Sequence, residues 1–507
     1  FSFIFNYHQK GPLMEFIFPV IFWKSFLPIP ILTFGAVMVL LFDIFASDEK
    51  RKATLWLSIA VLFITFISCL LSSPENSEIS FGGMYLFDGF TRSLFLIILI
   101  SSFIVILMSS IEKKFEENSY GDFLGLILFA TLGMMLMVST RNLVMIFIAL
   151  EIFSLSLYVL SGFFRSSLIG NEASLKYFLL GSFASGFLLF GIALIYGSTG
   201  STDLFEIIRF YELSSQKLVF FLGLSFLIVG LGFKIGAFPF YMWTPDVYQG
   251  SPTVATAFMS VGPKAAAFAA LFRILISTAG FSANKIEMTI WIIAVLTMTV
   301  GNLVAIWQKN IKRMLAYSSI AHVGYLLIAL VTINQAGTLS SGSFLFYVFV
   351  YSFMNIGAFV VIMLAKREDG SERTNIEEFS GLGLSRPGLA FSMAIFMIAL
   401  AGIPPTGGFV AKFYIFSAAI KSGFVWLAII AVLNSVISVF YYLRIIVVMY
   451  MNDTEEDVKK EQFRFVWGSR LSYAVVALVI CVIGTLSLGI FPSYFVDFAL
   501  NSNISLN

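Results

Sequence analysis

Apolar runs of about 20 residues recur along the whole chain, and this repetition limits the possible folds more than any other feature. A bilayer core roughly 30 Å thick is crossed by about 20 helical residues, so each run has the length of a transmembrane helix. Fourteen runs are found, at 26–45, 53–72, 88–110, 121–140, 142–164, 172–197, 218–240, 252–278, 286–307, 312–332, 343–365, 387–421, 424–448 and 471–492. The alternating pattern of barrel strands is absent. The sequence therefore predicts an all-α polytopic membrane protein.

Composition agrees with a lipid environment. Of the 507 residues, 59% are hydrophobic and 12% are charged, whereas a soluble domain carries about 25% charged residues. The net charge of +2 gives no basic excess of the kind that indicates nucleic-acid binding. Cys69 and Cys481 lie in separate apolar runs, so we expect them to act as small apolar residues and not as a disulfide or a metal site.

Lysine and arginine are divided unevenly between the two sides of the membrane. Loops that follow odd-numbered spans hold eighteen, the opposite side with both termini holds seven, and six lie within spans. Because basic residues concentrate in cytoplasmic loops, both termini are predicted to lie on the non-cytoplasmic side. Residues 1–25 are expected to form an N-terminal extension before the first span.

Charged residues inside the spans are the strongest functional signal. Such a residue must face protein, water or a counter-charge, because a charge at the bilayer centre costs roughly 3 kcal/mol or more. Lys264 and Lys412 lie well inside their spans, and the apolar sequence continues past Lys234. Glu151 occupies the centre of the run RNLVMIFIALEIFSLSLYVL. We interpret these four residues as functional. The alternative is a structural ion pair between Glu151 and one of the lysines.

Three further basic residues lie nearer to span ends. Lys176 sits about one turn into its span, so an interfacial position and a functional role both stay open. For Arg92 and Arg273 we expect snorkelling, in which the side chain reaches along the helix to the membrane surface.

Two of the buried lysines lie beside helix breakers. GFKIGAFPFYMWTPD places Lys234 five residues before Pro239, and AGIPPTGGFVAKF places Pro404 and Pro405 before Lys412. Both spans are therefore predicted to be discontinuous. Interrupted helices at membrane depth are tolerated where they line a cavity, and a pair of them points to an ion site. A proline kink used for packing is the alternative.

The two breaks, about 178 residues apart, suggest an internal repeat. Asn142-Leu143 matches Asn310-Ile311, and Tyr177 with Ser182-Phe183 matches Tyr347 with Ser352-Phe353. After helices 1–3, we expect two five-helix units that lie inverted in the membrane, because each has an odd number of spans. The predicted divisions are 26–120, 121–278, 279–450 and 451–507. His322, inside span ten, is suited to relay a proton or to pack as a neutral residue.

Three motifs resemble those of one family. WTPDVYQGSPT at 243–253, with GFKIGAFPF before it and the Pro263-Lys264 pair after it, looks like the signature of subunit N of the proton-pumping NADH:quinone oxidoreductase, respiratory complex I. NIKRMLAYSSIAHVGY at 310–325 and GIPPTGGFVAKFY at 402–414 resemble the family's other two strong motifs. The resemblance covers about residues 14–495. The family often has His where this chain has Tyr241, which places a proton carrier there in doubt.

The resemblance implies an antiporter-like subunit that moves protons in an energy-conserving membrane, such as a bacterial inner membrane. It further implies that FMN, iron-sulfur clusters and quinone are bound by partner subunits, among them another antiporter-like subunit, and that this chain binds no NADH. Residue by residue, Glu151 and Lys234 resemble the pair of the first half-channel, Lys264 the central lysine, and Lys412 the lysine of the second half-channel. Lys176 and His322 match less decisive relay positions.

Two other functions stay open at this point. A subunit of a multisubunit cation/proton antiporter resembles the same helical core, although the WTPDVY motif favours complex I. An inert membrane scaffold is the third possibility. The buried charges argue against it, because apolar residues would hold helices together at lower cost. The sequence has no CxxC cluster for an iron-sulfur centre, so electron transfer is expected on partner chains.

Overall fold

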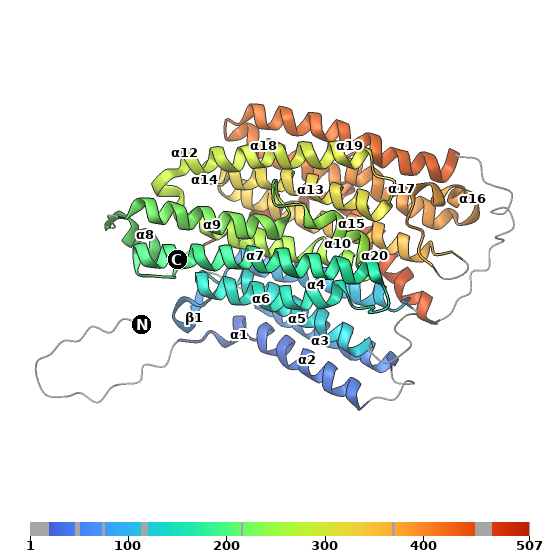
Figure 1. Cartoon of the computed structure of the whole chain (residues 1–507), viewed down its shortest axis with the longest axis horizontal. Helices are drawn as coiled ribbons and strands as arrows, with labels where there is room; N and C mark the ends of the chain where they lie inside the picture. Colours follow the sequence, from blue (N-terminus) through green and yellow to red (C-terminus); the bar gives the residue numbers. More distant parts are fainter. Residues whose placement is uncertain are drawn as a thin grey trace, which may run out of the picture.

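The structure, a computed structural model, describes residues 20–45, 51–72, 77–112, 120–213, 216–367, 371–451 and 469–505. In these residues the chain folds into a bundle of α-helices with one small two-stranded sheet (Figure 1). Thirteen of the described helices are long and apolar enough to cross a membrane. The predicted all-α polytopic class is confirmed. Most of the predicted N-terminal extension, residues 1–19, and most of the loop before the last span, 452–468, lie outside the described residues.

The chain reaches the first predicted unit through four helices and a hairpin. These elements are α1 (Trp23–Phe26), α2 (Pro28–Ile44), α3 (Arg51–Leu71), β1 (Glu78–Ser80), β2 (Tyr85–Phe87) and α4 (Gly89–Ser109). The antiparallel strands pair Glu78 with Phe87 and Ser80 with Tyr85. The first predicted unit contains α5 (Tyr120–Val138), α6 (Leu143–Ser161), α7 (Leu168–Thr199), α8 (Leu204–Leu213), α9 (Lys217–Ile235), α10 (Trp243–Gly250) and α11 (Thr253–Met259).

The rest of the bundle begins with the longest helix, α12 (Gly262–Ile306), which packs along α13 (Ile311–Val331). The later elements are α14 (Ile333–Ala336), α15 (Thr338–Leu364), a 3-10 turn (Ile376–Phe379), α16 (Leu382–Ser385), α17 (Pro387–Ala401), α18 (Gly407–Lys421), α19 (Val425–Met451), α20 (Ser469–Ile490) and α21 (Pro492–Leu500). The connection between the eighth and ninth spans is helical, so both spans share α12. The predicted boundary after residue 278 falls inside this helix, and the division into units stays a prediction.

Both predicted helix breaks are present, and their backbones are alike. Helix α9 ends before Gly236, at φ +77°, and α17 ends before Gly402, at φ +84°. Glycine adopts this left-handed conformation without the steric cost of a Cβ atom, which is why it ends helices so often. At each break two amide groups donate to carbonyls of the last turn: Gly236 N and Ala237 N to Gly232 O, and Gly402 N and Ile403 N to Ile398 O.

The two asparagines matched in the sequence also occupy equivalent places. Asn142 caps the N-terminus of α6, and its backbone forms an isolated antiparallel β-bridge with Asp203. Asn310 caps α13 in the same way, and its backbone forms such a bridge with Asn375. In each case the residue after the asparagine donates its amide to a carbonyl of the facing segment, that of Thr202 or of Thr374, with N···O distances of 2.8 Å. These shared details agree with an internal repeat. The opposite orientation of its two copies in the membrane stays a prediction.

The expected snorkelling of Arg273 is wrong. Its side chain is fully buried and pairs with both carboxylate oxygens of Asp88, at 3.1 Å each. Asp88 caps the N-terminus of α4 and accepts the amide of Ser505, so the pair joins α12, α4 and the C-terminal segment. Asp88 is the first residue of the predicted span 88–110, and the sequence does not pair it with an arginine on another helix. Arg92 instead donates to the last carbonyls of α3, at Cys69 and Leu70.

Candidate functional site

Lys234 lies in the last turn of α9, directly before the first break. Its side chain is buried, and Nζ donates to the hydroxyl of Ser154 on α6 at 2.7 Å and to that of Tyr177 on α7 at 3.3 Å. The ammonium also faces the rings of Phe153 and Tyr158, 4.8 and 5.5 Å from their centroids. Aromatic faces and a helix C-terminus both stabilise a cation, and among the described residues the groups that bond to or face this ammonium are neutral.

The WTPDVY motif supports this lysine from the other side of the break. Trp243 stacks on Tyr177 with 4.5 Å between ring centroids, and its indole N–H donates to the carbonyl of Phe233 at 2.9 Å. That carbonyl belongs to the final turn of α9 and also accepts the amide of Gly236 at 3.0 Å. The motif therefore fixes both the end of α9 and the ring that contacts Lys234.

Glu151 lies on α6 one turn before Ser154, on the same face of the helix. Among the described residues it forms no ion pair with Lys234, and its Oε1 atom is buried without a hydrogen-bond partner. The predicted pair is therefore separated in this structure, with the Ser154 hydroxyl bonded to Lys234. A role for Glu151 in tuning Lys234 stays a prediction.

Lys264 lies in the first turn of α12, and its side chain is buried. Its Nζ bonds to the hydroxyl of Ser319 on α13 and lies 5.7 Å from the ring centroid of Tyr248 on α10. Both partners are neutral. As with Lys234, the charged form is held by a hydroxyl and an aromatic face.

His322 lies on α13 one turn after Ser319, and both ring nitrogens have partners. Nδ1 is 2.7 Å from the hydroxyl of Tyr347 on α15, and Nε2 is 3.1 Å from that of Tyr442 on α19. The Tyr442 hydroxyl also bonds to Ser318. A hydroxyl can donate or accept, so either tautomer of the imidazole fits between the two tyrosines.

Lys412, on α18, reaches back across the second break. Nζ donates to the carbonyls of Leu400 and Ala401 at 3.0 and 2.8 Å, and to the hydroxyl of Ser435 on α19 at 2.9 Å. In a continuous helix these carbonyls would accept the amides of residues 404 and 405, but both are prolines and have no N–H. The prolines thus free two carbonyls for Lys412. The expectation that it lies beside opened backbone is confirmed.

One side of α13 connects Lys264 with Lys412. Ser319, His322 and Tyr325 follow each other at three-residue spacing along this helix. Lys264 bonds to the first, and the Lys412 ammonium lies 5.2 Å from the ring centroid of the third, with the imidazole between them. Residues that are three apart are neighbours on a helix surface, so buried polar groups extend from one lysine to the other.

Lys176 does not join this buried series. Its side chain is 43% exposed and pairs with Glu172 at 2.7 Å and Asp246 at 3.0 Å. Asp246 also binds Arg313, at 2.5 Å, and so links α7 to α13. Burial raises the pKa of Asp246, but hydrogen bonds from Arg313 and Lys176 outweigh this effect and hold the pKa below its usual value. The proposed relay role of Lys176 stays a prediction.

The hydroxyl partners of the lysines and of His322 were missed by the sequence reasoning. They are Ser154, Tyr177, Ser319, Tyr347, Tyr442 and Ser435. Serine and tyrosine are common in apolar helices, so nothing marks these positions in a single sequence. Tyr177 and Tyr347 did appear among the repeat matches, and each now contacts a predicted site residue.

The structure also places the two cysteines, the possible metal ligands and Tyr241. Cys69 and Cys481 are free and buried. Within the described part of the chain, no group of three or more His, Cys, Asp or Glu side chains is arranged to hold a metal ion. Tyr241, where the resembled family often has His, lies in the non-helical segment between α9 and α10. Its ring packs on the rings of Phe238 and Tyr317.

A bundle of apolar helices with two broken members and buried lysines at the breaks defines an antiporter-like membrane subunit. The chain matches the family described as NADH:quinone oxidoreductase/Mrp antiporter, TM, over residues 140–438. It is 43% identical over 486 residues to NADH-quinone oxidoreductase subunit N of Trichlorobacter lovleyi, covering 95% of this chain and 97% of that one. The chain therefore belongs to the subunit N family of NADH-quinone oxidoreductase.

Two solved structures share the fold. A chain of respiratory complex I from Thermus thermophilus with bound Aureothin aligns with a TM-score of 0.77 and 33% identity, covering 93% of this chain and 99% of that one. A chain of the Mrp complex from Dietzia aligns with a TM-score of 0.75 at 19% identity, covering 95% and 100%. The second likeness extends to the fold alone. Sequence identity favours the complex I family over the cation/proton antiporter alternative.

Proposed function

We propose that this chain translocates protons as a membrane subunit of NADH:quinone oxidoreductase and is driven by quinone reduction elsewhere in the complex. One observation carries the proposal. Lys234, Lys264 and Lys412 are buried, and among the described residues each bonds to or faces neutral hydroxyls, carbonyls or rings. Burial raises the free energy of the charged ammonium, and neutral partners offset this cost only in part. Each lysine can therefore both bind and release a proton.

The order of the groups suggests a route. A proton loaded on Lys234 passes to Lys264, then through the Ser319 and His322 side of α13 to Lys412. Glu151, one turn from the serine that holds Lys234, adjusts the first step through its charge. Lys176 serves at the surface end of the route, because it is paired and half exposed.

The partners and location follow from the same proposal. FMN, iron-sulfur clusters and quinone are bound by other subunits. This chain contacts further membrane-arm subunits, among them a second antiporter-like subunit, and the surrounding lipid. The complex lies in an energy-conserving membrane such as a bacterial inner membrane.

The central lysine offers the direct functional test. We expect Lys264→Met to lower proton uptake per NADH oxidised by about 100-fold, the lower range for a positioned proton-transfer group. The measurement uses the purified complex in lipid vesicles, with proton uptake and quinone reduction recorded together. NADH oxidation by an artificial acceptor is the control for assembly and should be unchanged. Proton uptake at the unmodified rate would exclude Lys264 from the route.

Sodium-driven antiport without NADH would favour the cation/proton antiporter alternative.

Membrane orientation gives a second prediction. The eighteen-to-seven division of Lys and Arg places both termini outside the cytoplasm. A reporter enzyme fused after Asn507 that is active only outside the cytoplasm should therefore be active, and a fusion in the loop between α15 and α17 should be inactive. The opposite pattern would reverse the orientation, and activity of both fusions would require a different number of spans.

A further inference from the structure

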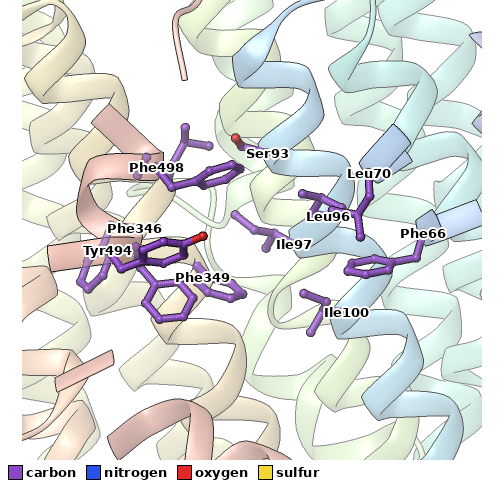
Figure 2. Close-up of a pocket in the computed structure, with 13 residues that line it drawn as sticks. Phe66, Leu70, Ser93, Leu96, Ile97, Ile100, Phe346, Phe349, Tyr494 and Phe498 are labelled. Carbon is purple, nitrogen blue, oxygen red and sulfur yellow. The ribbon is translucent and has the colours of Figure 1, made fainter. Parts of the chain in front are cut away.

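An apolar groove of about 230 Å³ has none of the buried lysines in its lining (Figure 2). Helices α3 and α4 form one wall, and α15 and α21 form the other. Residues that line it include Phe66, Leu70, Leu96, Ile100, Phe349 and Phe498. The hydroxyl of Ser93 also lines it but is bonded to that of Ser502 at 2.6 Å. Because this hydroxyl already has a hydrogen-bond partner, the inner wall of the groove is apolar and favours a hydrocarbon occupant.

The dimensions match one extended chain. From Ser93 to Ile100 the α4 wall rises roughly 10 Å at 1.5 Å per residue. The groove volume of about 230 Å³ has room for several groups of the size of a methylene or a water molecule. A transmembrane helix of a partner subunit is about 10 Å wide, so this volume is too small to seat one along the α4 wall.

One end of the groove lies at a membrane surface. Leu70 is next to the end of α3, and Ser93 lies near the start of α4. Arg92 precedes Ser93 and donates to the carbonyl of Leu70, so its positive charge lies beside this end.

From this geometry we propose a bound-lipid site. One acyl chain of an anionic phospholipid fills the groove, and its phosphate lies beside Arg92. The chain covers the apolar surfaces of α3, α4, α15 and α21, and thereby joins the first three spans and the C-terminal helix to the second predicted unit. Arg92 already donates through Nε and Nη2 to carbonyls of α3, so it attracts the phosphate by its fixed positive charge.

Site-directed photocrosslinking of the whole complex tests the site. Benzoyl-phenylalanine replaces Phe349 in the groove or, as the matched control, Phe63, which is 59% exposed on α3 and does not line the groove. The complex is reconstituted in phosphatidylcholine vesicles with a minor share of phosphatidylglycerol, extracted again, washed with excess detergent and irradiated. We expect about tenfold more phospholipid adduct at 349 than at 63, which equals about 1.4 kcal/mol of retention.

Two variants determine how the lipid is held. Leu96→Trp fills the groove and should remove the adduct at 349 while leaving the adduct at 63 unchanged. Arg92→Gln should keep the adduct but shift its headgroup composition toward phosphatidylcholine. Equal adducts at both positions would overturn the proposal, as would a quinone or peptide adduct at 349. An unchanged headgroup composition in Arg92→Gln would overturn the assignment of the phosphate to Arg92.

Discussion

Replacing Lys234 with methionine is expected to lower proton uptake per NADH by about 100-fold, the lower range for a positioned proton-transfer group. Methionine keeps the length and apolar stem of lysine but has no proton to release. Its flexible chain fits among Phe153, Tyr158 and Tyr177, which form the pocket for the stem and ammonium. The coupled vesicle assay of proton uptake and quinone reduction measures the effect.

Two comparisons make this result specific. Lys217→Met removes an exposed lysine at the start of the same helix and should leave pumping unchanged. Lys234→Arg keeps a cation and its donors but should fail like methionine, because a guanidinium does not release its proton at accessible pH. Normal pumping by the arginine variant would mean that only a fixed positive charge is needed at this position.

A double-mutant cycle tests the role of Glu151. If its charge tunes Lys234, the combined Glu151→Gln and Lys234→Met variant should lose less than the sum of the single losses. In this structure Glu151 and Lys234 are not bonded to each other, and the lysine ammonium donates a hydrogen bond to the Ser154 hydroxyl. Additive losses would show that Glu151 acts separately, at the entry of the route.

The sequence predicts the parts of the site that carry formal charge. A lysine in an apolar run stands out because it is costly there, and a proline or glycine beside it marks the break. Lys234, Lys264 and Lys412 were found for this reason, and both breaks lie where Gly236 and Gly402 end their helices.

What the sequence does not predict depends on contacts between distant helices. Ser319 and Tyr442 resemble many other polar residues in the spans, and only the packing of α12 and α19 against α13 selects them. The same limit explains the error at Arg273, because Asp88 lies 185 positions away in the sequence. The surface helix α8 and the hairpin were also missed, since both are shorter than a span and lie in loops.

The two breaks use lysine differently. Lys234 precedes its break and contacts side chains of α6 and α7, whereas Lys412 follows its break and bonds directly to backbone carbonyls. A repeat with equivalent backbones thus presents its two cations from opposite sides of the interruption. The freed carbonyls of Leu400 and Ala401 account for the position of the second lysine.

Replacing Lys412 with alanine is expected to lower proton uptake by about 100-fold, for the same proton-transfer reason as at Lys234. Quinone reduction is to be measured in the same vesicles, and NADH oxidation by an artificial acceptor should persist because the electron-transfer groups are proposed to lie on other subunits. Lys421→Ala, an exposed lysine at the end of the same helix, is the matched control and should pump normally.

Alanine also removes the Lys412 donor from the carbonyls of Leu400 and Ala401, of which Ala401 keeps the Ser435 hydroxyl, and a buried carbonyl left without a partner costs about 1–3 kcal/mol. A loss of pumping by this variant alone therefore has two explanations, a missing proton carrier or a loosened break. Lys412→Arg separates them, because it keeps donors for both carbonyls but does not give up its proton. Loss of pumping by an assembled arginine variant would identify Lys412 as a proton carrier. Full pumping by that variant would reduce Lys412 to a cap for the broken helix.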